Sequence, residues 1–211
     1  FLSFDNDPYP AVIDGKVLWI LDAYTTTSQF PYAQRANSRA VPSGDLRADF
    51  NYVRNSVKVV IDAYDGTVDF HIIDRTDPLA LSYEKQFPDL FSDQPPSLEL
   101  QEHFRYPEDL FRIQTDMWGR YRINGASEFY DAAGAWSVAQ DPGNQIGQTA
   151  REEVRDEQGN VLSSNEVRIN PQYLLMRLPN DESESFVIFR PFVPFSEDDS
   201  RKNLEGFMVV H

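Results

Sequence analysis

The stretch VKVVIDAYDGTVDFHII, residues 57–73, predicts a β-hairpin and decides the fold class of the chain. Two apolar runs flank Asp65-Gly66, a dipeptide typical of two-residue hairpin turns, because both central positions of such a turn need a positive φ. With this turn, one side of the hairpin is apolar throughout. Its cross-strand pairs are Ala63 with Val68, Ile61 with Phe70, and Val59 with Ile72. The turn and the pattern agree, so we predict two antiparallel strands here.

The same register gathers ionisable side chains on the second side of the hairpin. Asp62 faces Asp69 directly, and His71 lies on the adjacent diagonal. Like charges in directly opposite positions repel, so an arginine or lysine from a loop, a proton or a metal ion has to offset them. Two carboxylates and an imidazole can bind a divalent metal ion, which makes Asp62, Asp69 and His71 a candidate metal site. The alternative is an arginine from a loop, and four are available: Arg35, Arg39, Arg47 and Arg54.

The stretch VLWILDAYTTT, residues 17–27, repeats the Asp-Ala-Tyr of the hairpin at the end of another apolar run. An acid and a phenol two positions apart lie on one face of a strand. Asp22, Tyr24 and Tyr64, beside Asp62, are therefore candidates for a surface site on a common face of the sheet. The simpler interpretation is structural: the acids cap turns and the tyrosines cover the end of the sheet.

The rest of the chain alternates hairpin and helix patterns. Asp14-Gly15 predicts another two-residue hairpin turn, and the run 17–21, apolar on both faces, predicts a central strand. Further elements are expected as short helices within 77–91 and 95–104, a long helix from Pro107, a hairpin within 172–196 and a last strand. We therefore predict an α+β fold with a mainly antiparallel sheet, built from hairpins with interspersed helices.

We expect residues 1–211 to form a single soluble domain. The chain has 211 residues, 41% of them hydrophobic, which is enough to bury a core. Residues 25–50 lack a period and predict a long surface loop, and the polar residues 141–169 predict a mobile insertion with a minor hairpin around Gln158. Both ends lie in apolar runs, whereas natural termini usually end in polar residues, so we expect a domain excised from a larger protein.

Composition excludes several classes of function. The formal net charge is -15, which argues against nucleic acid as a partner. The chain has no cysteine, so thiolate catalysis, disulfides and cysteine-ligated zinc are excluded. It also lacks a Gly-x-Ser-x-Gly nucleophile turn and a glycine-rich phosphate loop. We assign no catalytic and no cofactor-binding residue.

Four long segments resemble one known family. They are DPYPAVIDGKVLWILDAYTTTSQFPYAQ (7–34), NYVRNSVKVVIDAYDGTV (51–68), HFRYPEDLFRIQ (103–114) and YLLMRLPNDESESFVIFRPFVPFSEDDSRKNLEGFMVV (173–210). The chain resembles the uncharacterised protein family UPF0182, a set of large bacterial integral-membrane proteins, over nearly its whole length. Residues 141–169 match least.

The resemblance implies a location and partners. Members of this family would carry several N-terminal transmembrane helices followed by a large soluble region, and this chain resembles a piece of that region. It would lie on the extracytoplasmic side of the bacterial cell membrane, attached through helices outside this chain. The family brings no accepted catalytic residue, ligand or cofactor, so none is carried over.

Three functions follow as hypotheses. The first is a non-catalytic domain that packs against the remainder of its own membrane protein or binds another envelope protein, because the runs QFPYAQ (29–34) and RPFVPF (190–195) combine aromatic rings with stiff backbone. The second is a cation-dependent enzyme or ion site on the acidic sheet face, with a divalent cation at Asp22, Asp62, Asp69 and His71. The third is cell-wall carbohydrate binding through Tyr24 and other aromatic side chains.

Overall fold

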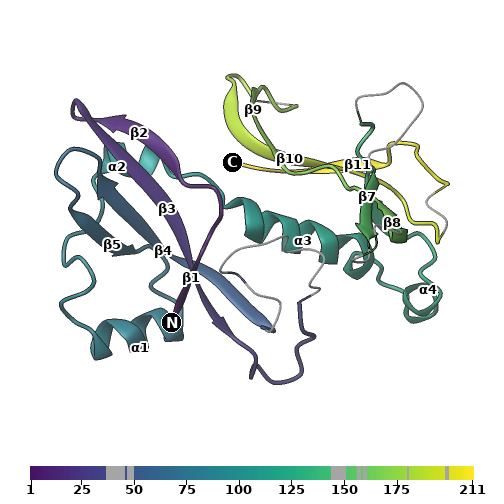
Figure 1. Ribbon diagram of the computed structural model, residues 1–211, viewed down its shortest axis with the longest axis horizontal. Coiled ribbons are helices and arrows are strands. Elements are labelled where there is room, and N and C mark those ends of the chain that lie inside the picture. Colours follow the sequence, from purple (N-terminus) through teal and green to yellow (C-terminus); the bar gives the residue numbers. More distant parts are fainter. Residues whose placement is uncertain are drawn as a thin grey trace. The chain divides into compact units, whose positions relative to one another are not determined.

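The computed structural model shows two compact units, Phe1–Ile113 and Gln114–His211 (Figure 1). It describes residues 1–36, 46, 50–143, 151–155, 158, 161–179, 181–197 and 200–211. Each unit is treated by itself below. That residues 1–211 form one domain stays a prediction.

Unit 1 is built on a five-stranded antiparallel sheet (Figure 1). The long strand β3 is its centre, because β4 pairs along one edge while β1 and β2 share the other edge. β5 pairs with the far side of β4. The strand bounds are β1 Leu2–Phe4, β2 Tyr9–Ile13, β3 Lys16–Thr27, β4 Tyr52–Asp62 and β5 Val68–Ile72. The central strand predicted at residues 17–21 is therefore confirmed.

The first hairpin has the predicted turn. Asp14 and Gly15 both have positive φ, 50° and 75°, and Ile13 is paired with Lys16. Both central residues of a type I′ turn lie in this left-handed region, which Gly and Asp tolerate better than branched residues.

The second hairpin exists, but its predicted register is wrong by two residues. Val60, not Asp62, lies opposite Asp69, and the chain closes through Asp62 donating its N–H to the Thr67 carbonyl oxygen at 3.0 Å. Only Gly66 in this turn has a positive φ, so the two-residue turn does not form. The carboxylates of Asp62 and Asp65 accept the N–H groups of Tyr64 and Thr67, and these local bonds stabilise a wider turn.

Helices cover the two faces of this sheet. α1 (Pro78–Gln86) begins at its N-cap Asp77 and packs Ala80 and Tyr83 on the face that carries Ala23, Val57 and Val59. α2 (Leu98–Glu102) packs Leu100 on the opposite face against Ile20 and Val60. Both helices were predicted. Helices this short are not stable in isolation, so they depend on packing their few apolar side chains against the sheet.

The long helix α3 (Glu108–Tyr121) starts one residue after Pro107, from which it was predicted, and carries Glu108 and Asp109 in its first turn. Leu110 and Ile113 are buried with Tyr24, Leu46 and Phe50. Leu46 and Phe50 lie in the segment 25–50 that was predicted to be a surface loop, and so do the last three residues of β3, of which Thr25 is fully buried. The prediction is wrong for these residues. The apolar surface of Leu46 and Phe50 completes the core beside Tyr24.

Unit 2 contains a four-stranded antiparallel sheet around β10. β11 pairs with one edge of β10, and β9 and β6 pair in succession with the other. The bounds are α4 Ala126–Tyr130, β6 Trp136–Val138, β9 Gln172–Met176, β10 Ser185–Pro194 and β11 Gly206–Val210. The hairpin within 172–196 and the last strand are confirmed, whereas α4 and β6 were not predicted.

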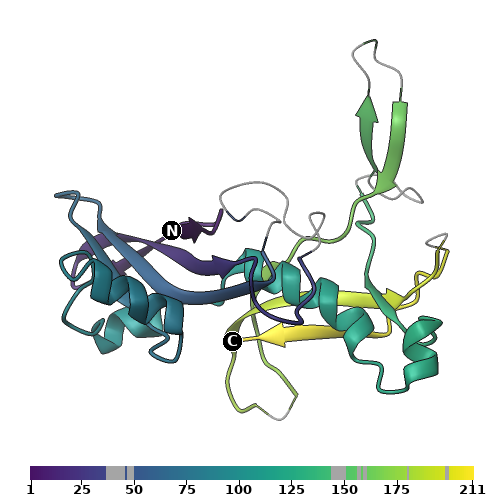
Figure 2. The same cartoon turned by 90° about the horizontal axis from the view of Figure 1, so that it is seen from below.

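A separate two-stranded sheet lies within the segment predicted as an insertion. β7 (Arg151–Arg155) pairs antiparallel with β8 (Val161–Glu166), which confirms a minor hairpin there (Figure 2). Residues 144–150 and the Gly159-Asn160 part of the predicted turn lie outside the described residues. The mobility of 141–169 stays a prediction.

The predicted α+β class with mainly antiparallel strands is confirmed. None of the helices in the described part of the chain is long and apolar enough to cross a membrane.

Gly119 tests the packing of unit 2. A Cβ atom at Gly119 would collide with the main-chain carbonyl oxygen of Trp136. Helix propensity alone predicts that Gly119→Ala stabilises α3 by about 1 kcal/mol. We predict instead that this variant lowers the free energy of unfolding by about 1–3 kcal/mol, because overpacking outweighs propensity. Urea unfolding measures the change.

The control is Met117→Ala on the same helix, where the side chain is exposed and we expect a change within about 0.5 kcal/mol. A Gly119→Ala variant more stable than the parent would show that the close approach of α3 to Trp136 is absent.

Candidate functional site

The structure does not bring the three predicted metal ligands into one site. Asp62 accepts a hydrogen bond from Lys16 Nζ at 2.7 Å, Asp69 is exposed opposite Val60, and His71 is buried opposite Lys58. Among the residues that the structure describes, no group of three or more carboxylate or imidazole side chains is placed to hold a metal ion. The corrected register is the reason, because it removes the direct Asp62–Asp69 opposition.

The predicted surface site is also wrong. Asp22 and Tyr24 do share a sheet face, but they are 2% and 0% exposed, whereas Tyr64 in the turn is 95% exposed. α2 and the start of α3 cover the face of Asp22 and Tyr24, and Tyr64 lies beyond its edge. The two Asp-Ala-Tyr segments therefore do not build one site.

A buried polar cluster occupies this covered face instead. Its members are Asp5, Asp22, Tyr24, Lys58 and Asp109, and each of them is at least nine-tenths buried. They come from the residue after β1, from β3, from β4 and from the first turn of α3. We call this set the polar cluster.

The centre of the polar cluster is an ion pair between Asp22 and Lys58. The two residues are direct partners in the β3–β4 ladder, and their side chains are 3% and 2% exposed. Lys58 Nζ also donates to the Arg105 carbonyl oxygen at 2.8 Å and lies over the ring of Phe104. Asn55 Nδ2 donates to Asp22 Oδ1 at 2.7 Å. Each charge is thus both paired and hydrogen-bonded, as burial requires.

A bulge in β4 selects the side chains that reach this pair. Ala23 is paired with Val57 and Tyr24 with Asn55, so Ser56 has no Cα partner on β3. The extra residue reverses the alternation, which turns Asn55 toward Asp22. It turns Ser56 to the other face, where its hydroxyl donates to Asp77.

Asp5 connects the sheet to α3. Its Oδ2 accepts the Tyr24 hydroxyl and, at 3.0 Å, the backbone N–H of Asp109 in the first turn of α3. Its Oδ1 accepts the N–H of Asp7 at 2.9 Å, which is the Asx-turn expected before a proline. A carboxylate at the positive end of a helix is favourable, so Asp5 acts as a cap supplied from 104 residues away in the chain.

Burial dominates the pKa values in the polar cluster. It raises the pKa of Asp109 to about 6, with the negative charge of Asp5 adding to the effect and Arg112 opposing it. It also raises the pKa of Asp22 and lowers that of Lys58, in each case against the attraction of the partner. Burial and then the charge of Asp5 raise the pKa of the Tyr24 hydroxyl, which stays a hydrogen-bond donor.

A second polar centre lies on the opposite sheet face at the N-cap of α1. Asp77 accepts hydrogen bonds from the hydroxyls of Thr25, Ser56 and Tyr52, and from the N–H of Leu79. Burial acts to raise the pKa of Asp77, but these bonds outweigh it and hold the pKa below its usual value. One acid therefore fixes the end of α1 to two strands.

The polar cluster has the chemistry of a structural core. Its acids accept hydrogen bonds from partners inside the protein, and a reacting molecule would have to displace those partners. The two pockets described in this structure are lined by other side chains. Lys58 offsets Asp22, Arg112 lies beside Asp109, and outside the cluster Lys16 pairs with Asp62. Of the arginines predicted to offset Asp62 and Asp69, Arg54 pairs with Asp74, and Arg39 and Arg47 lie outside the described residues.

Sequence reasoning missed Asp5, Lys58 and Asp109 as members of the polar cluster. One signal was available: Lys58 interrupts the apolar run VKVVI, and a charge in a central strand needs a buried partner. Asp5 and Asp109 each have a local role that hides the longer contact, because Asp5 precedes a proline turn and Asp109 lies at the positive end of a helix. Both local roles are present in the structure. The hydrogen bond that joins Asp5 to Asp109 cannot be predicted from their spacing in the sequence.

The fold and the polar cluster define a mixed α+β region whose ionisable interior serves packing. The chain belongs to the family described as "Uncharacterised protein family (UPF0182)", whose profile matches residues 1–211. This confirms the resemblance inferred from the four segments.

Relatives of the chain carry the same family name. It is 38% identical to a UPF0182 protein of Trichodesmium erythraeum over 94% of the chain and 21% of that protein. It is 38% identical to one of Methanospirillum hungatei over 100% of the chain and 20% of that protein, and 40% identical to one of Clostridium acetobutylicum over 91% and 18%. The chain thus spans about a fifth of the length of these relatives. No solved structure matches it.

The buried ion pair yields a double-mutant prediction. Lys58→Met should lower the free energy of unfolding by about 3–5 kcal/mol, because it leaves Asp22 buried without its cation. The double variant Lys58→Met with Asp22→Leu should lose clearly less than the sum of the single losses. Urea unfolding of the four proteins of the cycle provides the values.

The matched control is Lys16→Met, which breaks the pair with Asp62 where the lysine side chain is 58% exposed. Water screens the exposed lysine, so the loss should be clearly smaller than that of Lys58→Met, with Asp62 itself 8% exposed. Equal losses for the Lys58 and Lys16 variants would contradict a buried pair at the centre of the sheet.

The raised pKa of Asp109 predicts a pH dependence. Its folded pKa of about 6 lies above the usual 3.8, so the folded chain binds more protons than the unfolded chain between these pH values. The free energy of unfolding should therefore fall as pH rises from about 4 to about 6. Groups with lowered pKa, such as Asp62 and Asp74, act in the opposite direction but below this window.

Asp109→Asn should flatten this slope, measured as urea unfolding at several pH values. Asp65→Asn serves as the control, because Asp65 has a lowered pKa and contributes outside the window. An unchanged slope in the Asp109 variant would contradict the proposed burial of its carboxyl group.

Proposed function

We propose that the chain is a non-catalytic, extracytoplasmic part of a multi-pass membrane protein, and that it works by packing against the rest of that protein. The observation that carries the proposal is an aromatic surface on unit 2. Family membership and the chain's share of its relatives' length support a role within a larger protein.

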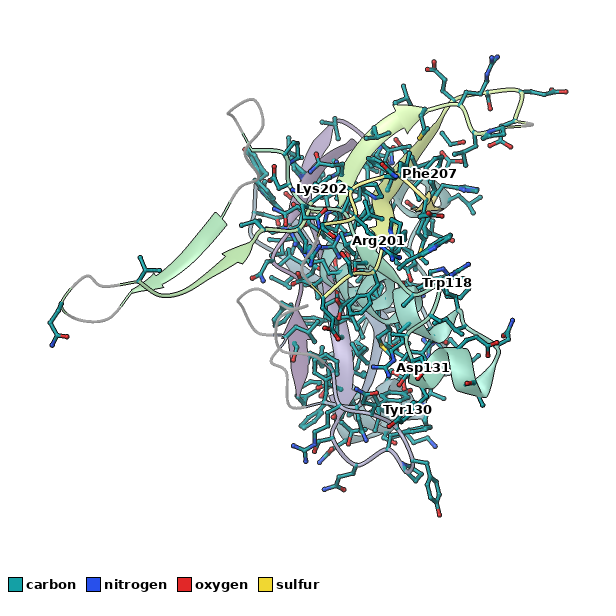
Figure 3. The ribbon with its side chains drawn as sticks, turned by 90° about the vertical axis from the view of Figure 1, so that its right-hand side faces the viewer. Trp118, Tyr130, Asp131, Arg201, Lys202 and Phe207 are labelled. Carbon is teal, nitrogen blue, oxygen red and sulfur yellow. The ribbon has the colours of Figure 1, made fainter. Side chains whose placement is uncertain are left out.

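The aromatic surface combines large rings with basic side chains. Trp118 of α3, Tyr130 at the end of α4 and Phe207 of β11 are 47%, 85% and 51% exposed. Figure 3 labels these three rings and the exposed Arg201 and Lys202. Phe207 packs against Phe189 on the sheet face opposite to Arg190, which donates to Thr115 of α3. Trp, Tyr and Arg are the residues most enriched at the energetic centres of protein interfaces. Exposed rings of these types on unit 2 favour a protein contact over free solvent.

The predicted aromatic–proline runs divide between two roles. In RPFVPF, Phe192 and Val193 are buried strand residues, while Phe195 is partly exposed. In QFPYAQ, Phe30 and Tyr32 are both exposed. The exposed rings of the two runs are therefore Phe30, Tyr32 and Phe195, and the aromatic surface on unit 2 is formed by other residues.

The polar cluster supports a non-catalytic role. A general acid or base has to reach a substrate, whereas Asp22, Tyr24 and Lys58 are buried and already hydrogen-bonded to one another or to their neighbours. These groups hold strands together, and such a task requires neither a substrate nor a divalent cation.

One labelling experiment tests location and contact together. Tyr64→Cys and Tyr130→Cys are each placed in the full-length membrane protein, freed of other cysteines, and intact cells are treated with a membrane-impermeant maleimide. Tyr64→Cys should be labelled quickly without permeabilisation, because its side chain is fully accessible in unit 1. Tyr130→Cys should be labelled several-fold more slowly, because the rest of the protein covers it.

The two parts of the proposal, the extracytoplasmic location and the contact, can be contradicted independently. Labelling of Tyr64→Cys only after permeabilisation would contradict the extracytoplasmic location. Equal labelling rates at the two positions would contradict the contact. Protection of Tyr130→Cys that disappears when other envelope proteins are removed would assign the contact to a separate partner instead.

A further inference from the structure

The edge of β5 that faces away from β4 has backbone N–H and C=O groups that are only partly paired. In an antiparallel pair, alternate residues direct their N–H and C=O groups toward and away from the partner strand. Ile73 donates to the Ser56 carbonyl oxygen at 2.9 Å, and Asp62 donates to Thr67 at 3.0 Å. These bonds fix the alternation, so Phe70 and Ile72 direct their backbone groups away from β4.

The chain itself already pairs with the first part of this edge. Phe70 and Phe91 form a parallel bridge, and Ser92 donates its N–H to the Phe70 carbonyl oxygen at 2.9 Å. The pairing ends there, because the chain bends at Asp93 and Gln94 and then leads through Pro95-Pro96 to the start of α2. In the part of the chain that the structure describes, the outward N–H and C=O of Ile72 have no partner.

A pocket of about 420 Å³ lies at this unpaired position. Its walls are the end of β5, the segment 92–96 and the residues Gln101 and Phe104. The volume falls in the range of pockets that hold small ligands or a few residues of extended peptide. The pocket is lined by residues of unit 1 alone.

We propose that this pocket receives an extended segment from the remainder of the same polypeptide, whose main chain pairs with Ile72 as an added strand. The segment would supply an acceptor for the Ile72 N–H and a donor for its C=O. This is strand addition at a sheet edge, in which main-chain bonds give affinity and flanking pockets accept alternate side chains.

The lining of the pocket suits a peptide. Gln94 offers an uncharged amide, Phe104 offers an apolar wall, and Arg75 and Asp93 add one charge of each sign. Ser92 and Gln101 donate to the carbonyl oxygens of Gln94 and Pro96, which shapes the wall formed by the segment 92–96. His71 also lines the pocket, and its ring Nδ1 is buried without a hydrogen-bond partner among the described residues. Rotation of that ring toward a bound peptide would give the nitrogen a hydrogen-bond partner. A buried polar atom without such a partner is energetically unfavourable.

The same polypeptide is the favoured source of the segment. The chain corresponds to about a fifth of its relatives' length, so about four fifths of such a protein lies outside it. A segment tethered in the same molecule has a high effective concentration and needs few contacts to bind. The inference concerns unit 1 and is independent of the aromatic surface on unit 2.

Photo-crosslinking in the full-length membrane protein tests the proposal. Gln94, an exposed residue that lines the pocket, is replaced by p-benzoylphenylalanine, and the crosslinked peptides are identified by mass spectrometry after irradiation. We expect a crosslink within the same polypeptide, to a segment outside residues 1–211. The blocking variant Gln101→Trp should abolish this crosslink by filling the pocket.

Glu102→Trp is the matched control, since Glu102 is exposed on the same helix but does not line the pocket, and it should leave the crosslink intact. Hydrogen–deuterium exchange of the segment 68–73 provides a second readout, and Gln101→Trp should make this segment exchange faster while Glu102→Trp should not. No crosslink together with unchanged exchange would overturn the proposal. A crosslink to a separate protein, to a glycan or to residues 1–211 would also overturn it.

Discussion

The structure of unit 1 depends on one buried ion pair between neighbouring strands. Asp22 and Lys58 face each other in the middle of the sheet, and almost no water reaches either side chain. Two charges in such a place stabilise a fold only when their remaining hydrogen bonds are also satisfied. Asn55 satisfies Asp22, and the Arg105 carbonyl oxygen satisfies Lys58. The pair therefore fixes the register of β3 and β4 and draws the chain after α2 onto the sheet.

The other buried acids extend this constraint to the two ends of the sheet. Asp5 joins the residue after β1 to Tyr24 and to the first turn of α3, while Asp77 joins the first turn of α1 to Thr25 and Ser56 on the opposite face. The bulge at Ser56 serves both, because it sends Asn55 to one face and Ser56 to the other. Acidic side chains that suggest an acid–base site in the sequence thus hold strands and helices together through hydrogen bonds. This is why we interpret the chain as a packing and binding part of a larger protein.

Local chemistry determined which features could be predicted from the sequence. The Asp14-Gly15 turn and the helix starts depend on residues within a few positions, and they were predicted correctly. The register of the second hairpin was predicted wrongly because the carboxylates of Asp62 and Asp65 accept backbone N–H groups and so compete with the expected turn. The prediction of which side chains share a sheet face was still correct, because a shift of two residues keeps every side chain on its face. The bond between Asp5 and Asp109 joins residues 104 positions apart, and a single sequence holds no pattern that reports it.

Carboxyl footprinting tests the central claim most directly. The folded protein is treated with a water-soluble carbodiimide and glycine ethyl ester, and modification of each acid is followed by mass spectrometry. The account predicts that Asp5, Asp22 and Asp109 stay unmodified, while the exposed Asp14 and Asp65 react at the rate of a free carboxylate. Modification of Asp22 as fast as that of Asp65 in the folded protein would show that this acid is open to reagents, and would contradict a sealed ion pair as the basis of the fold.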